Sequence, residues 1–311
     1  MQILMLGAGG IGGYFGAKIH RAGGDVTFLV RPARANYLVA NGLQVFSSLG
    51  DIHITPKIVT SVQDSATGKF DAVVLSCKAY DLDTAIDSVT PALDSQGVVI
   101  PLLNGFTHLA RLDAQFGRER VLGGFAHLGV TLAPGGEIRH LNDLHRLVIG
   151  CRTKSVSPLI HSLAELLTSS GIDFSLSENI ECEMWDKFIF LSALAGATCT
   201  MRSPIGDILQ THSGEEFIIG LLDECIAIAK EFGHTSSPER LSAYRNQLTM
   251  PGSTSAASML RDIEQKRRTE ADHILGDMIR RAEAMEINTP LLKIAYSHLQ
   301  AYEIRRNHER T

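Results

Sequence analysis

The chain has 311 residues, of which 44% are apolar and 20% charged, and its formal net charge is −5. This length is sufficient for two hydrophobic cores, so we expect two domains. The slight acidic excess argues against nucleic acid or an anionic membrane as a partner. Five cysteines stand far apart in the sequence, without the paired spacing of a zinc site or a disulfide framework, which favours a reducing, cytoplasmic setting.

The N-terminal stretch is apolar enough to suggest a signal peptide, but it lacks the other features of one. Its first cation is Lys18, and glycines interrupt the stretch throughout. No window approaches the roughly 18 uninterrupted apolar residues that a membrane span requires. We therefore expect a soluble, cytoplasmic protein without a targeting segment.

Short apolar runs alternate with longer helix-compatible stretches up to about residue 150. Such alternation is typical of βαβ units and a parallel sheet, so the sequence predicts an N-terminal doubly wound sheet of the Rossmann type. The runs that we interpret as its strands are Ile3–Leu6, Val26–Val30, Ala72–Ser76 and Val98–Leu102.

Residues 121–150 change character and predict an antiparallel extension of that sheet. Pro134-Gly135-Gly136 marks a turn between two β-compatible arms, and Arg146–Ile149 reads as a further strand. An amphipathic helix is then predicted from Ser155 to Ser170, ended by Gly171. Strand-like runs disappear after residue 178, so we expect a Rossmann-type domain over 1–178 and an all-helical domain over 179–311.

Start signals locate helices in the second half. Thr289-Pro290 places a capping residue before a proline at the first helical position, and predicts the start of the last helix. Thr269 and Asp272 have the spacing of a capping box, which predicts another helix from Thr269. The long apolar segment 183–200 is interpreted as the central helix of the domain.

A glycine-rich loop predicts a dinucleotide site. Gly7, Gly9 and Gly12 form G-x-G-x-x-G directly after the first strand and at the start of a helix, with Gly10 and Ile11 between them. In this setting the glycines permit a tight turn, close approach of a pyrophosphate to the backbone, and close helix–strand packing. The sequence therefore predicts cofactor contacts along this loop.

The end of the second strand favours NADP over NAD. An NAD-specific site carries an Asp or Glu there to bind the ribose hydroxyls, whereas this chain has Val30-Arg31. A guanidinium at this position suits a 2′-phosphate. Arg34 is close enough in sequence to add a second charge, although either arginine could instead be a solvated loop residue.

Two polar residues follow the next predicted strands. Lys78 comes after the third strand and Asn104 after the fourth, at the sheet edge where ligands bind in such folds. Either residue taken alone could be a loop residue that bonds its own backbone. Two of them at the same edge favour a binding site.

These features resemble the ketopantoate reductase (2-dehydropantoate 2-reductase) family over essentially the whole chain, in the order and spacing of its motifs. The resemblance implies a Rossmann domain and a helical domain with a site between them. It also implies NADPH-dependent reduction of the C2 carbonyl of 2-dehydropantoate in pantothenate biosynthesis. The motifs that carry it are SCKAYD, LLNGFTH, EMWDKF at 183–188, SML at 258–260 and RRTEAD at 267–272.

The resemblance implies roles for individual residues. Lys187 matches the catalytic lysine and Glu270 a motif glutamate, whereas the matches to substrate and cofactor contacts are Asn104, Ser258, Lys78 and, for the 2′-phosphate, Arg31. Hydride transfer to a ketone produces an alkoxide, which needs a cation and proton donor such as Lys187. A helix dipole would keep Glu270 ionised if it lies in a first turn.

Structural explanations exist for each of these side chains. Lys187 could be a surface cation on an amphipathic helix, and Glu270 or Ser258 a helix cap. Trp185 and Phe188 beside the lysine could line a pocket or belong to the core.

The helix of Lys187 also departs from the family pattern. Asparagines are common one and two turns after the lysine in the family, whereas this chain has Leu191 and Ala195. We expect a less polar pocket and hypothesise a 2-oxo acid with a more apolar side chain packed on Leu191. Ser255 and Asn104 could instead have taken over the polar contacts, with 2-dehydropantoate kept as substrate.

Two other functions stay open at this point. An opine-type or 3-hydroxyacid dehydrogenase also joins a Rossmann domain to a helical one, but lacks the pairing of Lys187 with RRTEAD. A non-catalytic NADP-binding sensor would keep the cofactor site without turnover. The sequence predicts a small-molecule substrate and no metal, and is compatible with a homodimer.

Overall fold

The computed structural model describes residues 1–62, 68–154 and 156–309, which form two compact units. The first unit comprises Met1–Leu103 and His108–Glu181, and the second comprises Asn104–Thr107 and Cys182–Thr311. The chain therefore contributes four residues to the second unit well before it enters that unit permanently at Cys182.

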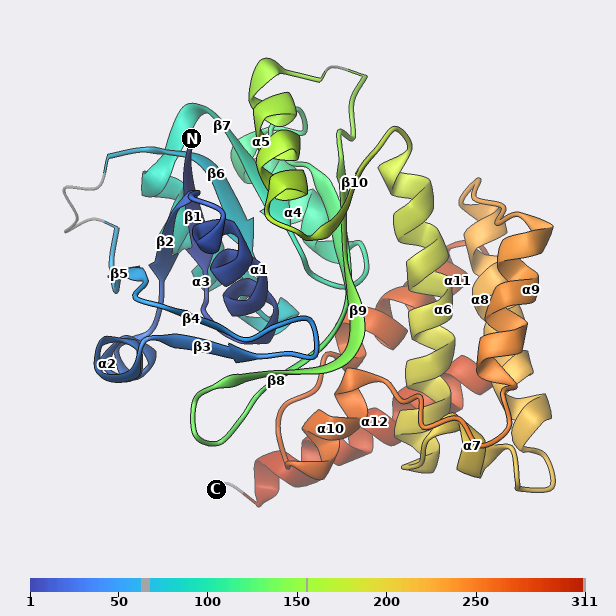
Figure 1. Ribbon diagram of the computed structural model, residues 1–311. Helices are drawn as coiled ribbons and strands as arrows, with labels where there is room; N and C mark the ends of the chain where they lie inside the picture. Colours follow the sequence, from blue (N-terminus) through green and yellow to red (C-terminus); the bar gives the residue numbers. More distant parts are fainter. Residues whose placement is uncertain (63–67, 155, 310–311) are drawn as a thin grey trace. The chain divides into compact units, whose positions relative to one another are not determined.

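The first unit is built on a parallel sheet, as predicted. Its order is β5-β2-β1-β6-β7, and the order reverses beside β1, which is the topology of a doubly wound sheet (Figure 1). Its strands are β1 (Gln2–Leu6), β2 (Asp25–Leu29), β5 (Lys57–Val59), β6 (Phe70–Leu75) and β7 (Leu93–Pro101). The helices that accompany them are α1 (Gly10–Arg21), α2 (Pro32–Asn41), α3 (Leu82–Val89) and α4 (Thr107–Phe116). Continuous buried runs such as Ile3-Leu4-Met5 show that both faces of the sheet are covered.

The antiparallel pair predicted over 121–150 is present, but it belongs to a second sheet. β8 (Gly123–Leu132) and β9 (Ile138–Gly150) form a long hairpin (Figure 1). β9 pairs at its start with β3 (Leu43–Phe46) and at its end with β10 (Asp173–Ser177), and β3 pairs with β4 (Ile52–Ile54). The prediction of an extension was therefore wrong, because β9 is long enough to recruit partners that were not recognised as strands.

The helix predicted from Ser155 to Ser170 is α5 (Pro158–Ser169), and Ser155 itself lies outside the described residues. Proline occupies its first position, where a missing N–H is tolerated. Gly171, with φ +65°, follows the helix end as predicted.

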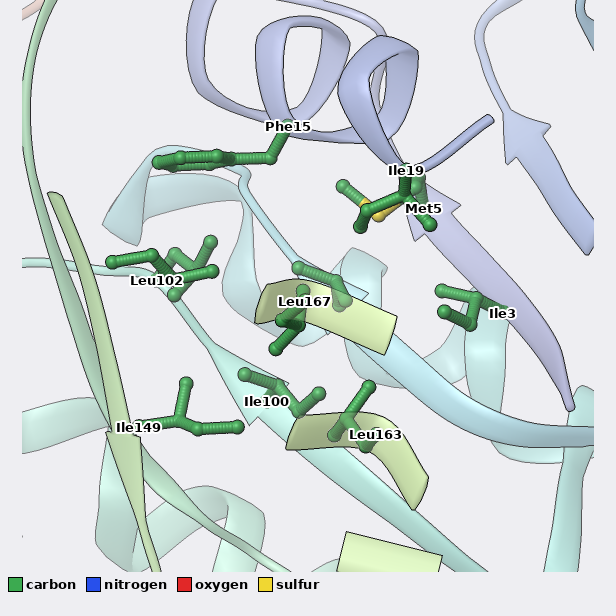
Figure 2. Close-up of a pocket in the computed structure, with 11 residues that line it drawn as sticks. Ile3, Met5, Phe15, Ile19, Ile100, Leu102, Ile149, Leu163 and Leu167 are labelled. Atoms are coloured by element: carbon green, nitrogen blue, oxygen red, sulfur yellow. The ribbon is translucent and has the colours of Figure 1, made fainter. Parts of the chain in front are cut away.

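A small cavity lies in the core of the first unit (Figure 2). Side chains from β1, α1, β6, β7, β9 and α5 surround it, and all of them are apolar. An apolar cavity holds no groups that could orient a polar ligand or retain water. This cavity is therefore not a candidate binding site for a polar ligand. The lining residues are Ile3, Met5, Phe15, Ile19, Val74, Ile100, Leu102, Leu147, Ile149, Leu163 and Leu167.

The second unit is helical, as predicted: no strand occurs between residues 182 and 309, all of which are described. α6 (Ile180–Met201) covers the predicted central helix, and its residues 192–199 are all buried. α12 begins at Pro290, as the Thr289-Pro290 signal predicted. The remaining helices are α7 (Ile205–Ile208), α8 (Gly214–Glu231), α9 (Pro238–Leu248), α10 (Ser258–Glu264), α11 (Asp277–Ala284) and α12 (Pro290–His308). Among the described helices, none is both long and apolar enough to cross a bilayer.

The helix predicted to start at Thr269 begins later, and its capping box does not form. The Thr269 amide and hydroxyl both donate to Glu303, at 2.6 and 2.7 Å. The Asp272 carboxylate accepts from the Tyr296 hydroxyl at 2.6 Å. These long-range partners take the side chains that a local box would need. The first helical turn is a π-turn over Asp272–Gly276, so Glu270 precedes the helix and does not lie in its first turn.

Candidate active site and cofactor site

The glycine-rich loop joins β1 to α1 and has the shape of a pyrophosphate cradle. Gly7 has φ +94°, in the left-handed region that favours glycine. A Cβ at Gly12 would lie 2.3 Å from Ser76 Oγ and 2.5 Å from the Gly7 carbonyl oxygen, so only glycine fits there. A Cβ at Gly9 would have no neighbour within 4 Å, which leaves that backbone open to approach. α1 starts at Gly10, and the first amides of a helix attract anions. These residues fit a dinucleotide.

Replacing Gly12 and Gly9 by alanine should have different effects on stability and on cofactor binding. Gly12→Ala should destabilise the protein itself by about 1–3 kcal/mol, because the methyl group would displace Ser76 and the loop. Gly9→Ala should fold normally, because its backbone is extended and its methyl group meets no protein atom, yet it should bind NADPH more weakly. Thermal unfolding and cofactor titration of both variants would test this. Parent-like NADPH affinity in Gly9→Ala would contradict the cradle.

The arginines after β2 differ in their surroundings. Arg31 precedes α2 and its side chain is 79% exposed, with one guanidinium nitrogen 3.0 Å from Asp81 Oδ2. Arg34 is more buried: it donates to the carbonyls of Ala8 at 3.0 Å and Gly136 at 2.6 Å. Arg34 therefore braces the loop and is neither a solvated residue nor a second mobile charge. Arg31 presents the accessible guanidinium of the two.

Lys78 stands at the carboxyl end of β6, as predicted, immediately before a 3₁₀ turn over Ala79–Asp81. Its backbone carbonyl accepts from the Asp81 amide at 2.9 Å, which closes that turn. β6 is adjacent to β1 in the sheet, so this turn shares the edge of the glycine-rich loop.

Lys187, Asn104 and Glu270 come together within the second unit. Lys187 Nζ donates to Asn104 Oδ1 at 3.1 Å. Burial lowers the pKa of Lys187 to about 8, and the nearby Glu270 carboxylate opposes that shift. Glu270 is itself buried, with 7% of its surface exposed. A lysine with this pKa can donate and accept a proton near neutral pH.

The backbone around Asn104 packs tightly against other residues of the second unit. Gly105 has φ +77°, and a Cβ there would lie 3.2 Å from the His273 carbonyl oxygen and 3.3 Å from the Phe188 ring. The Phe106 ring packs 4.8 Å from the Trp185 ring, between centroids. The segment that carries Asn104 is therefore fixed by packing on both sides.

The aromatic residues beside Lys187 belong to the core. Trp185 and Phe188 are 8% and 1% exposed. The Arg281 guanidinium lies 5.1 Å from the Trp185 ring and 5.4 Å from the Phe106 ring, while its Nε donates to Asp277 at 3.0 Å. Both rings therefore belong to the hydrophobic core of the second unit.

His273 is a site neighbour that the sequence reasoning missed. It forms a hydrogen bond with the Asn104 backbone, and burial lowers its pKa, opposed by Glu270. The lowered pKa favours the neutral form of the ring. His273 lies three residues after Glu270 in the sequence, and this spacing is the signal that could have identified it as a site neighbour.

The other predicted substrate residues are more dispersed. Ala195 is completely buried in the helical core, so it cannot face a substrate as it stands. Leu191 is partly exposed and packs against that core. Ser255 and Ser258 are exposed, and Ser258 is the first residue of α10.

The described residues contain no group of three or more His, Cys, Asp or Glu side chains that could hold a metal ion. All five cysteines are free thiols.

Models of known protein families match the chain in both units. The family described as "Ketopantoate reductase PanE/ApbA" matches residues 3–154, and its C-terminal counterpart matches residues 179–303. An uncharacterized oxidoreductase, YkpB of Bacillus subtilis, is 35% identical and covers 97% of this chain and 99% of its own. A 2-dehydropantoate 2-reductase of Pyrococcus horikoshii is 27% identical and covers 97% and 98%.

Solved structures share the fold. A PanE/ApbA family ketopantoate reductase from Ralstonia eutropha superposes with a TM-score of 0.89 at 24% identity, covering 99% of this chain and 100% of that one. A D-mandelate dehydrogenase with NADH and anilino(oxo)acetate superposes with a TM-score of 0.88 at 20% identity, with the same coverage. At these identities the likeness concerns the fold.

Proposed function

Because the chain belongs to the ketopantoate reductase family, we propose that it uses NADPH to reduce a 2-oxo acid to a 2-hydroxy acid, with 2-dehydropantoate as the leading substrate. As a member of this family, the protein is an oxidoreductase that depends on a nicotinamide dinucleotide. The choice of NADPH and of the substrate is the proposal. The observation that carries it is the partly buried Lys187 bonded to Asn104 beside Glu270.

Each residue of the lysine cluster has a part in carbonyl reduction. A nicotinamide cofactor, when bound, would supply the hydride that adds to the carbonyl carbon. The Lys187 ammonium gives a proton to the oxygen, so that the alkoxide charge does not accumulate. Asn104 Oδ1 orients the ammonium, and the Glu270 carboxylate stabilises its charge within the protein. Protonation by Lys187 thus completes the conversion of the ketone to the alcohol.

The cofactor would be held mainly by the first unit. The pyrophosphate would contact the backbone of the glycine-rich loop, and Arg31 would bind the 2′-phosphate of NADPH. Lys78 and Asn104 would add contacts from the ends of the next two strands. The full set is Gly7, Gly9, Gly10, Ile11, Gly12, Arg31, Lys78 and Asn104.

The substrate side chain is proposed to pack on Leu191. An aliphatic residue offers no hydrogen bond to a polar substrate, so a more apolar 2-oxo acid would lose less than 2-dehydropantoate does. Proteins similar to this chain are named for different substrates: the Pyrococcus horikoshii protein is a 2-dehydropantoate 2-reductase, and one solved structure is a D-mandelate dehydrogenase. Ser255, Ser258 or Asn104 could supply polar contacts in place of the missing asparagine.

Leu191→Asn is expected to raise kcat/KM for 2-dehydropantoate by about 10-fold or less, because one regained hydrogen bond contributes roughly 0.5–1.5 kcal/mol. The same substitution should lower kcat/KM for 2-oxo acids with larger apolar side chains. Steady-state kinetics of both proteins on both substrate types would measure this. Efficient 2-dehydropantoate turnover by the parent, with no gain in Leu191→Asn, would contradict the preference for a more apolar substrate and support 2-dehydropantoate.

A non-catalytic NADP-binding sensor is the alternative from another class. It would bind NADPH but oxidise none of it with any member of a panel of 2-oxo acids. NADPH consumption followed with such a panel therefore tests the proposed function directly. The intact set of Lys187, Asn104 and Glu270 favours turnover.

A further inference from the structure

The Arg31–Asp81 ion pair stands at the edge of the sheet where the cofactor is proposed to bind. Arg31 follows β2 and Asp81 follows β6, the two strands on either side of β1. All three strands are parallel, so these segments meet at one edge. β1 itself leads into the glycine-rich loop. The pair therefore joins the two segments that flank the loop.

Both side chains extend from fixed backbone. The Arg31 carbonyl accepts from the amides of Arg34 and Ala35, at 2.9 and 3.0 Å, which anchors it to α2. Asp81 closes the 3₁₀ turn with Lys78. The guanidinium and carboxylate meet at 3.0 Å, with side-chain exposures of 79% and 35%. Ligands can reach both groups, and the two groups have opposite charge.

The two charges suit the two forms of the adenosine ribose. In NADPH the 2′ position carries a phosphate, which a guanidinium binds and a carboxylate repels. In NADH it carries a hydroxyl, which can donate to a carboxylate. We propose that Asp81 is a second cofactor-specificity residue that opposes Arg31, so that the protein binds both dinucleotides and Asp81 limits its preference for NADPH. This inference rests on the proposed cofactor site.

Asp81→Asn tests the proposal, with Asp83→Asn as its matched control. Asp83 lies two residues further along the chain and pairs with Arg111 at 2.6 Å instead of Arg31. Dissociation constants of NADPH and NADH would be measured by calorimetry, without substrate. Asp81→Asn should bind NADPH about 3- to 10-fold more tightly and NADH about 3- to 10-fold more weakly, since the pair is partly solvated. Asp83→Asn should change either affinity by less than about twofold.

Arg31→Ala is the complementary test, because it removes the other charge of the ion pair. It should weaken NADPH binding by about 10- to 100-fold and leave NADH nearly unchanged. In the Arg31→Ala background, Asp81→Asn should give a smaller gain for NADPH, because no guanidinium is left to release. The inference is overturned if Asp81→Asn behaves like Asp83→Asn, or if its NADPH and NADH affinities move in the same direction. A parent protein that binds both dinucleotides but reduces no 2-oxo acid would contradict the proposed function alone.

Discussion

Replacing Lys187 by alanine should lower kcat for carbonyl reduction by about 10²-fold or more, with NADPH affinity nearly unchanged. The reason is that the ammonium interacts with the oxygen most strongly when the alkoxide forms. The lysine belongs to the second unit, whereas the glycine-rich loop belongs to the first. Single-turnover kinetics and cofactor titration would separate the two effects.

Two further variants control for damage to the fold. Lys187→Met keeps an unbranched side chain of similar length without the charge, so it should lose activity like Lys187→Ala while retaining more stability. Glu270→Gln should reduce kcat less than either, because Glu270 acts on the ammonium and not on the carbonyl. If Lys187→Ala turns over normally on the best substrate, Lys187 is not the proton donor.

Sequence patterns predicted the structure correctly where interactions between neighbouring residues determine it. The glycine spacing requires a tight turn and close packing, and the structure shows both at Gly7 and Gly12. The proline at position 290 marks a helix start whose signal lies entirely within neighbouring residues. The parallel sheet followed from uninterrupted apolar runs, because only strands covered on both faces have them.

Contacts between residues far apart in the sequence explain the features that were not predicted correctly. The helix start at Thr269 was wrong because Glu303, 34 residues away, takes the groups of the local cap. Ala195 shares a helix with Lys187, yet it is completely buried, which helical spacing alone cannot reveal. Asn104 and Lys187 are 83 residues apart, and although the family resemblance selected both residues, it did not predict their hydrogen bond. The partner of Arg31, 50 residues away, could not be read from the sequence.

The proposed role of Lys187 as proton donor predicts a specific pH dependence of the reduction. Burial lowers this pKa from 10.5 to about 8, so the ammonium is progressively lost above pH 8. Reduction needs the protonated form as donor, whereas oxidation of the hydroxy acid needs the neutral amine as acceptor. The neighbouring His273 does not complicate this range, because its pKa is lowered from 6.5 and its ring is already neutral.

We therefore expect kcat/KM for reduction to fall about tenfold per pH unit above pH 8, reaching about 100-fold at pH 10. Oxidation of the hydroxy acid should instead rise about tenfold per pH unit below pH 8 and level off above it. Initial rates in both directions between pH 6 and 10, at saturating cofactor, would measure the two limbs. Lys187→Met should lose both limbs, since no other group would supply this titration. A reduction rate that stays constant to pH 10 would show that the donor is not a lysine with a lowered pKa, and limbs of the same sign in both directions would show that the titrating group is not the proton donor.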